Sequence, residues 1–123
     1  MSLFLADLAG ADIEHLFNHL KDNYAPFDVE LLNDLDPLIA YESVGDYGCD
    51  SSSFFLFRNR ETNELFEMHG SHCSCMGFEN QFSLESVTIE YLKSKHFGIP
   101  TGGYDDQAEN NKDKIKKYIN DFL

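Results

Sequence analysis

The segment SFFLFRN, residues 53–59, decides how the rest of the chain is organised. Its four consecutive residues Phe54 to Phe57 are all apolar, and successive side chains of a strand point to opposite faces of a sheet. Apolar side chains on both faces are typical of a strand in a sheet that is covered on both sides. We therefore predict that residues 53–59 form a central strand around which the other elements pack.

Two further strands are predicted beside this central one. Residues 38–44 (LIAYESV) roughly alternate between apolar and polar side chains, and the glycines and serines that follow them indicate a turn. Residues 64–70 (ELFEMHG) follow the central segment after the short connection RETN, which predicts a hairpin. In that segment Phe66 and Met68 share one face of the strand. The three segments together predict a three-stranded antiparallel meander.

Helices are predicted before these strands. Residues 11–24 (ADIEHLFNHLKDNY) place apolar side chains at helical spacing, with Asp12 as the N-cap. This spacing leaves His15 and His19 on the opposite face, where a solvent-facing pair is favoured over a metal site because no third ligand is evident nearby. Residues 28–36 (DVELLNDLD) predict a second short helix that begins at an aspartate and ends before a proline.

Two more helices are predicted after the strands. Residues 86–97 carry Ile89 and Leu92 as inward positions, with Thr88 or Ser86 as the cap. The final helix begins near residue 106 and carries four lysines on its outer side. Its inward side chains are Ile115, Tyr118, Ile119 and Phe122. The sum is an α+β fold in one compact domain, residues 1–123, with N-terminal helices, the three-stranded meander, and two C-terminal helices packed on the sheet.

The net charge is the strongest compositional signal in the sequence. Twenty-two acidic and nine basic residues give a formal charge of −13 at pH 7. Residues 1–57 hold eleven acidic residues and one lysine, a net of −10, whereas residues 58–123 hold eleven acidic and eight basic residues, a net of −3. Such a first half repels phosphate, which disfavours direct nucleic-acid binding, and attracts a basic partner. An acidic surface that only keeps the protein soluble is the plainer alternative.

The cysteines and the N-terminus bear on the compartment. Cys49, Cys73 and Cys75 are an odd number of cysteines, which fits a reducing compartment better than a disulfide framework. The first ten residues lack the basic region of a secretory signal. No apolar run approaches the roughly 20 residues that a membrane-spanning helix needs. We expect a cytoplasmic protein without a membrane segment.

The sequence HGSHCSC, residues 69–75, concentrates metal-ligand chemistry in one stretch. His69 ends the predicted strand, and the other ligand types are His72, Cys73 and Cys75. Histidine and cysteine are the ligands that zinc prefers, but four of them so close together would close almost no loop. Cys49 could replace one of the four and improve the spacing. No cofactor is favoured on this spacing, and zinc is the metal that the cluster would take.

Two other interpretations of the same stretch need no metal. The first is a reactive thiol, which needs a histidine or the positive end of a helix beside the cysteine. His72 directly precedes Cys73, and Glu79 is the candidate proton carrier. Alternatively the stretch is a structural turn, because it is rich in small residues and cysteine is often buried. The structural turn is favoured. The chain also lacks the metalloprotease, phosphate-loop, nucleophile-elbow and zinc-deaminase motifs, so the sequence leans against an enzyme.

The segment ELFEMHGSHCSCMGFENQF, residues 64–82, followed by TIEYLK, residues 88–93, resembles a group of small phage and prophage proteins of unknown function. These proteins share a strand that ends in HGSHCSC, then Gly-x-Glu-x-Gln, an aromatic residue and a helix that begins with threonine. The corresponding positions here are Gly77, Glu79, Gln81, Phe82 and Thr88, with Phe82 standing where the group has tryptophan. The resemblance covers roughly the third quarter of the chain. It implies a phage or mobile-element setting and no particular activity.

Two functions follow as hypotheses. The first is a small acidic binding or regulatory protein that engages a basic protein surface, as an inhibitor, a mimic of nucleic acid or an immunity-like protein. The acidic residues expected to form its binding face are Asp28, Glu30, Asp34 and Asp36. The alternative is a metal- or thiol-dependent enzyme centred on His69, His72, Cys73 and Cys75, with Glu79. The sequence favours the binding protein.

Overall fold

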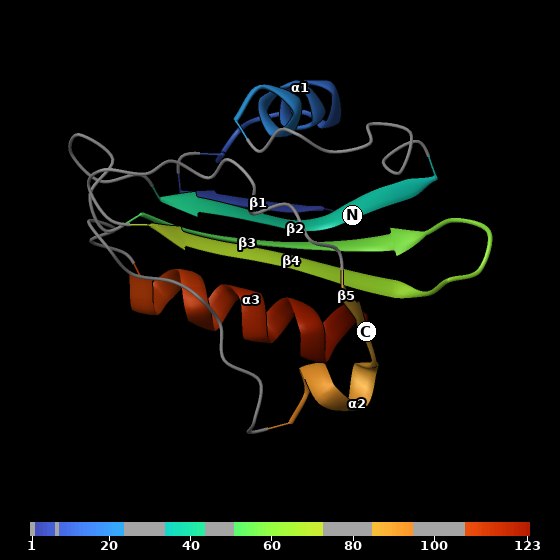
Figure 1. Ribbon diagram of the computed structural model, residues 1–123. Coiled ribbons are helices and arrows are strands. Elements are labelled where there is room, and N and C mark those ends of the chain that lie inside the picture. Colours follow the sequence, from blue (N-terminus) through green and yellow to red (C-terminus); the bar gives the residue numbers. More distant parts are fainter. Residues whose placement is uncertain (1, 7, 24–33, 44–50, 73–84, 95–107) are drawn as a thin grey trace.

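The protein contains a five-stranded mixed sheet with helices on both faces (Figure 1). The computed structural model describes residues 2–6, 8–23, 34–43, 51–72, 85–94 and 108–123, with only the backbone for 21–23, 51, 52, 69–72, 108 and 109. Its elements are β1 (Leu3–Ala6), α1 (Ile13–Asn23), β2 (Leu35–Ser43), β3 (Ser51–Asn59), β4 (Leu65–His72), β5 (Glu85–Val87), α2 (Ile89–Leu92) and α3 (Ala108–Phe122). The strands are ordered β1-β2-β3-β4-β5. Strand β1 is parallel to β2, and the other neighbouring pairs are antiparallel.

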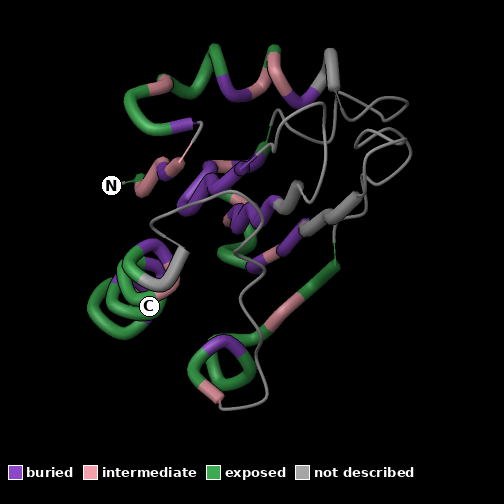
Figure 2. Tube along the Cα trace, turned by 90° about the vertical axis from the view of Figure 1, so that its left-hand side faces the viewer, coloured by how far each residue is buried: buried purple, intermediate pink, exposed green. Residues whose placement is uncertain are grey.

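Strand β3 lies at the centre of the sheet, as residues 53–59 predict. Helix α1 covers one face of the sheet, and α2 and α3 lie on the other face (Figure 1). Phe54 and Leu56 point towards α3, whereas Phe55 and Phe57 point towards α1, and all four are fully buried. The sheet is therefore the middle layer of three, and many of the buried residues lie in its strands between the helix layers (Figure 2).

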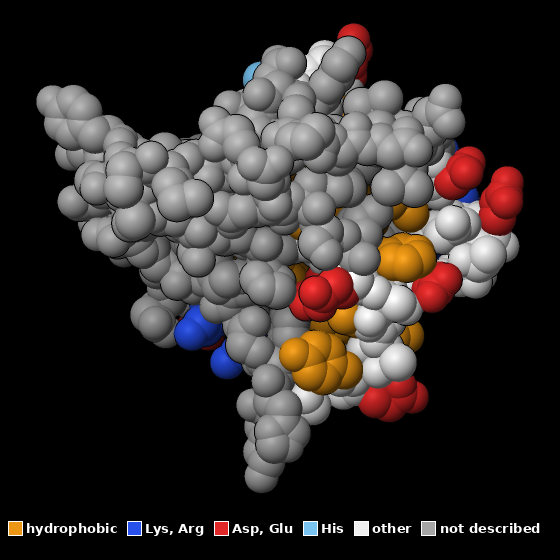
Figure 3. All heavy atoms as spheres, viewed as in Figure 1, with side chains coloured by type: hydrophobic (Ala, Val, Ile, Leu, Met, Phe, Trp, Pro, Cys, Tyr) orange, Lys and Arg blue, Asp and Glu red, His pale blue; other side chains and the backbone are white. Residues whose placement is uncertain are grey.

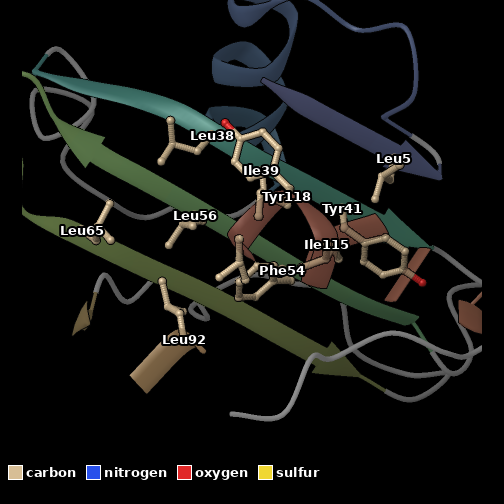
Figure 4. Close-up of a cluster of buried hydrophobic side chains, with 11 residues drawn as sticks. Leu5, Leu38, Ile39, Tyr41, Phe54, Leu56, Leu65, Leu92, Ile115 and Tyr118 are labelled. Carbon is tan, nitrogen blue, oxygen red and sulfur yellow. The ribbon is translucent and has the colours of Figure 1, made fainter. Parts of the chain in front are cut away.

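Two hydrophobic clusters lie on opposite faces of the sheet. The cluster on the α3 face contains Leu5, Leu38, Ile39, Tyr41, Phe54, Leu56, Leu65, Leu92, Ile115, Tyr118 and Ile119 (Figure 4). The cluster on the α1 face contains Leu8, Leu16, Leu20, Leu35, Ala40, Phe55, Phe57 and Met68. Met68 and Leu65 are thus on opposite faces of β4, as the strand alternation predicts. A register shift in β2 between Pro37 and Ile39 places both Leu38 and Ile39 on the α3 face.

The predicted fold class is wrong, because the three-stranded meander is only the interior of a larger mixed sheet. Strand β1 was not predicted: its four residues are too few to show a periodicity, and it forms only by pairing with β2, more than thirty residues later. Strand β5 was also not predicted, and it pairs with the first part of β4. The first two residues of the predicted helix 86–97 therefore belong to a strand, and α2 is a single turn.

The predicted helical segments are only partly correct. Helix α1 begins after Asp12, whose Oδ1 accepts a hydrogen bond of 2.7 Å from the His15 N–H, as an N-cap does. Thr88 caps α2 in the same way. The predicted helix 28–36 overlaps the structure only at 34–36, where the chain makes a turn and enters β2. Its remaining residues lie outside the described part of the chain.

Two predicted inward side chains of the C-terminal helices are instead exposed. Ile115, Tyr118 and Ile119 of α3 are buried, but Phe122 is 55% exposed. In α2, Leu92 is buried and Ile89 is 40% exposed. Both exceptions lie near the ends of short or terminal helices, where the sheet beneath no longer covers the whole apolar stripe.

Candidate functional site

A buried carboxylate and a histidine meet between α1 and the sheet. Leu16 and Leu20 are fully buried against the sheet, and this orientation of α1 brings the intervening His19 close to β2. Glu42 lies two residues after Ala40 on β2, so its side chain points to the same face. The His19 Nε2 atom is 2.6 Å from Glu42 Oε2, and the side chains are 24% and 5% exposed. This contact is a short, charge-assisted hydrogen bond that joins the helix to the sheet.

A third polar side chain lies next to this pair. Ser53 of β3 is the direct partner of Glu42 across the sheet, and partners in register project from the same face. Ser53 is fully buried, and its Oγ atom makes no hydrogen bond to any residue that the structure describes. The neighbour of Ser53 on β4 is Gly70, so no side chain fills that position of the row. Glu42, Ser53 and His19 thus form a polar spot, named here the buried polar site, within an otherwise apolar layer.

The buried polar site overturns the prediction that His15 and His19 both face solvent. His15 is exposed, whereas His19 is partly covered and bonded to Glu42. The sequence contained part of the signal: Glu42 follows Ala40 at strand spacing in a segment predicted to be a strand. The partner of Glu42 could not be found, because the pairing depends on how α1 is rotated against a sheet formed far along the chain.

The histidines of the HGSHCSC stretch lie in β4 at the same end of the sheet. In backbone register His69 pairs with Phe54, and His72 pairs with Ser51. The predicted cluster residues Cys73, Cys75 and Glu79 lie outside the described residues, as does Cys49. Among the side chains that the structure describes, no group of three His, Cys, Asp or Glu residues could hold a metal ion. The backbone nevertheless brings the histidine segment to the row that contains Glu42 and Ser53.

The opposite end of the sheet is acidic. Asp34 is exposed just before β2, and Asp36 in β2 forms an ion pair of 3.2 Å with Arg60, so two residues of the predicted binding face lie here. Asp28 and Glu30, the other two, lie outside the described residues. The Arg60 N–H donates a 3.0 Å hydrogen bond to the Asp34 carbonyl oxygen, which joins the start of β2 to the turn between β3 and β4.

The turn and β5 add further carboxylates to this end. The backbone N–H of Glu61 donates to Asn59 Oδ1 at 2.8 Å, which holds the turn in shape. Glu64 accepts a 2.8 Å hydrogen bond from the Ser86 hydroxyl and so lies beside β5, which contributes Glu85. We name this surface the acidic end, and its members are Asp34, Asp36, Glu61, Glu64 and Glu85. Figure 3 shows acidic side chains gathered at this end of the described surface.

The positive charges of the described residues are concentrated on α3. Lys114, Lys116 and Lys117 are exposed there, as the sequence predicts. Beneath them Tyr118 is buried, and this burial raises the pKa of its hydroxyl above the ordinary 10.0, against the opposing effect of the Arg58 guanidinium. Among the described residues, carboxylates gather at the acidic end, and four lysines lie on α3, which also carries Asp113 and Asp121.

The comparisons with known proteins returned nothing: no family model, curated protein or solved structure matches this chain. In the described part of the chain, no helix is long and apolar enough to cross a membrane.

Proposed function

We propose that this chain is a small acidic binding protein that engages a basic surface of another protein, in an inhibitory, mimicking or immunity-like role. Its resemblance to small phage and prophage proteins supports a phage or mobile-element origin for that role, and its odd number of cysteines supports a cytoplasmic location. The observation that carries the proposal is the acidic end, where five carboxylates from three separate segments share one end of the sheet.

The charges of the acidic end are arranged to attract a basic partner. Asp34, Glu61, Glu64 and Glu85 are exposed, and Arg60 is already paired with Asp36. Surfaces of one sign steer partners of the opposite sign and accelerate association by roughly 10- to 1,000-fold, an effect that salt weakens. Such steering acts on the encounter rate more than on the lifetime of the complex. A partner of this protein should therefore associate quickly at low salt and more slowly at high salt.

Charge reversal at the acidic end tests the proposal. The variant Asp34→Lys/Glu61→Lys changes two exposed side chains, and Glu90→Lys/Asp113→Lys, on α2 and α3, is the matched control with the same change in net charge. The partner is first isolated from a host lysate on immobilised protein, and association rates are then measured by surface plasmon resonance at two salt concentrations. We expect the first variant to associate at least about tenfold more slowly at low salt, and the control to change far less.

Two results with the variants would contradict the proposal. In one, the Asp34/Glu61 variant remains folded by circular dichroism and still binds the same partner at the same rate and salt concentration. In the other, both double variants lose the same amount of binding, which would mean that net charge matters and the acidic end does not. A partner with an acidic binding surface would also exclude it.

A second candidate is a metal- or thiol-dependent enzyme centred on His69, His72, Cys73 and Cys75, with Glu79 as a proton carrier. The observation that favours it is the buried polar site, because the strand that carries the two histidines runs beside it. Elemental analysis of untagged protein, combined with thiol counts before and after unfolding, tests this candidate. About one zinc per chain, or one fast-reacting thiol, would support it. Absence of metal, with all three thiols reacting only on unfolding, would exclude it.

A further inference from the structure

The N-terminal strand β1 forms one edge of the sheet. Its residues Leu3–Ala6 pair with β2 on one side, and β1 is the last strand in the order of the described sheet. Figure 2 shows it at the margin of the sheet, next to the N-terminus. Alternate residues of an edge strand direct their backbone N–H and C=O groups away from the sheet, where another extended chain can pair with them.

The two edges of the sheet differ in how they are protected. Natural edge strands are commonly blocked by charged side chains, proline or covering elements. Strand β5, at the other edge, carries Glu85 and is polar and exposed. Strand β1 has the sequence LFLA, with neither a charge nor a proline. Within the part of the chain that the structure describes, its shortness is the only common protection that it has, so β1 is the edge at which an added strand is favoured.

Hollows open on both sides of the β1 edge. On the α1 side, a hollow of about 730 Å³ is lined by the start of β1 and by residues 10–14. On the α3 side, a smaller hollow of about 180 Å³ lies between Leu3 and the last two turns of α3. An added strand projects successive side chains to opposite faces of the sheet. Its alternate side chains would therefore enter the two hollows in turn.

Exposed apolar side chains border each hollow. Ile13 is 48% exposed and lines the hollow on the α1 side. Phe122 is 55% exposed and lines the one on the α3 side. These are the two most exposed large hydrophobic side chains in the described part of the chain. Both therefore lie where a docked strand would cover them.

The charges around the two hollows differ, and they identify the partner chemistry. The α1-side hollow carries the carboxylates of Asp12 and Glu14, and none of the described residues that line it is a lysine or arginine. The α3-side hollow is apolar within, and its margin carries the two ammonium groups of Lys114 and Lys117 against the one carboxylate of Asp121, a net positive charge that disfavours a basic side chain. A segment that places lysine or arginine on the α1 side and leucine or phenylalanine on the α3 side fits both.

We propose that β1 is a docking edge for an extended segment of a basic partner protein in which basic and large apolar residues alternate. This inference rests on the proposed function and adds the site and the sequence pattern. The start of β1 is tied to the acidic end, because the Ser2 hydroxyl donates a 2.7 Å hydrogen bond to the Pro37 carbonyl oxygen, one residue after Asp36. The acidic end attracts the basic partner, and β1 seats its extended segment.

Peptide binding tests the proposal. The probes are three fluorescein-labelled peptides of about seven residues, long enough to cover β1. The first alternates lysine and leucine, the second has the same composition with its lysines and leucines in two blocks, and the third is the alternating peptide with every backbone amide methylated. Fluorescence anisotropy gives the Kd of each. We expect the alternating peptide to bind at least about tenfold more tightly than the other two, and to slow hydrogen exchange at the amides of Leu3–Ala6.

Matched protein variants locate the site. Glu14→Lys and Glu90→Lys each reverse an exposed acid in the first turn of a helix, but only Glu14 borders a hollow beside β1. Phe122→Ala and Tyr91→Ala each remove an exposed aromatic ring, but only Phe122 borders β1. We expect Glu14→Lys and Phe122→Ala each to weaken binding of the alternating peptide at least about fivefold, and the controls to change it less than about twofold.

The possible failures are distinguishable. Equal binding of all three peptides, in a manner that salt weakens, overturns the docking edge and leaves the proposed function intact. Absence of binding by every lysine-bearing peptide counts against both. Dimerisation of the free chain through β1, detected by sedimentation and reversed by the alternating peptide, would show that a second copy of the chain binds at this edge. That result would overturn the proposal that a separate partner protein binds there. Equal losses in the Glu14 and Glu90 variants would place the peptide elsewhere.

Discussion

The hydrogen bond between His19 and Glu42 is the contact whose removal tests the packing of α1 most directly. The Glu42 side chain is 5% exposed, and breaking a fully buried charged pair by removing one partner costs about 3–5 kcal/mol. His19 is 24% exposed, so water screens the contact in part, and a hydrogen bond to a charged group contributes about 1.5–3 kcal/mol. We therefore expect His19→Ala to lower the free energy of unfolding by about 2 kcal/mol. At about 4 °C per kcal/mol for a chain of this size, Tm falls by about 8 °C.

Urea unfolding followed by circular dichroism measures this loss. His15→Ala is the matched control, because His15 lies one turn earlier on α1 and is exposed, and we expect it to change stability by less than about 0.5 kcal/mol. A double-mutant cycle of His19→Ala with Glu42→Gln should give a coupling of at least about 1 kcal/mol. Equal effects of the two histidine variants, or a coupling near zero, would refute the assignment of this contact as a stabilising link.

Three further expectations concern buried side chains. Ser53→Ala should raise the free energy of unfolding by about 1 kcal/mol in urea titrations, because the buried hydroxyl makes no hydrogen bond, and a loss of stability would contradict this. Ile115→Ala should lower it by about 2–5 kcal/mol in the same assay, whereas Phe122→Ala, which removes an exposed ring, should have a far smaller effect. Burial raises the pKa of Tyr118 in the folded state above its value of about 10 in the unfolded state. The stability that the protonated hydroxyl contributes is therefore fully present below pH ~10 and is lost as the pH rises through the higher folded pKa. Tyr118→Phe should therefore reduce the alkaline loss of stability, and an unchanged profile between pH 9 and 12 would contradict it.

The interior of the sheet could be predicted because its signal is local. Residues 54–57 are apolar on both faces, and this pattern alone predicts a covered central strand with neighbours on each side. The two neighbours were found because a short connection or a turn signal lies beside each of them. The caps at Asp12 and Thr88 were found for the same reason, since a cap is defined within four residues of sequence.

The edges of the sheet could not be predicted in this way. Strands β1 and β5 have four and three residues, so neither contains enough alternation to identify a strand. Each exists because a partner strand distant in sequence supplies hydrogen bonds. The start of the chain is too short to show a strand pattern, and residues 86 and 87 continue in sequence directly into the predicted helix.

The buried polar site was missed because it depends on three elements at once. His19 borders the apolar stripe of α1, and a small rotation of the helix decides whether it faces water or the sheet. Glu42 faces α1 only because β2 shifts register between Pro37 and Ile39. The binding role of Asp34 and Asp36 stays a prediction. Both residues lie at the acidic end, which Glu61, Glu64 and Glu85 join through sheet pairing that the sequence does not display.

The division of the core into two clusters has a consequence for the internal motions of the protein. Because the sheet separates them, the two helix layers share few side-chain contacts and are linked mainly through the backbone of β2, β3 and β4. Each layer is thus a candidate for separate local unfolding, in which α1 detaches from one face while α3 stays in place on the other, or the reverse. The slowest-exchanging amides would then lie in β3, the strand that both openings leave hydrogen-bonded on its two sides.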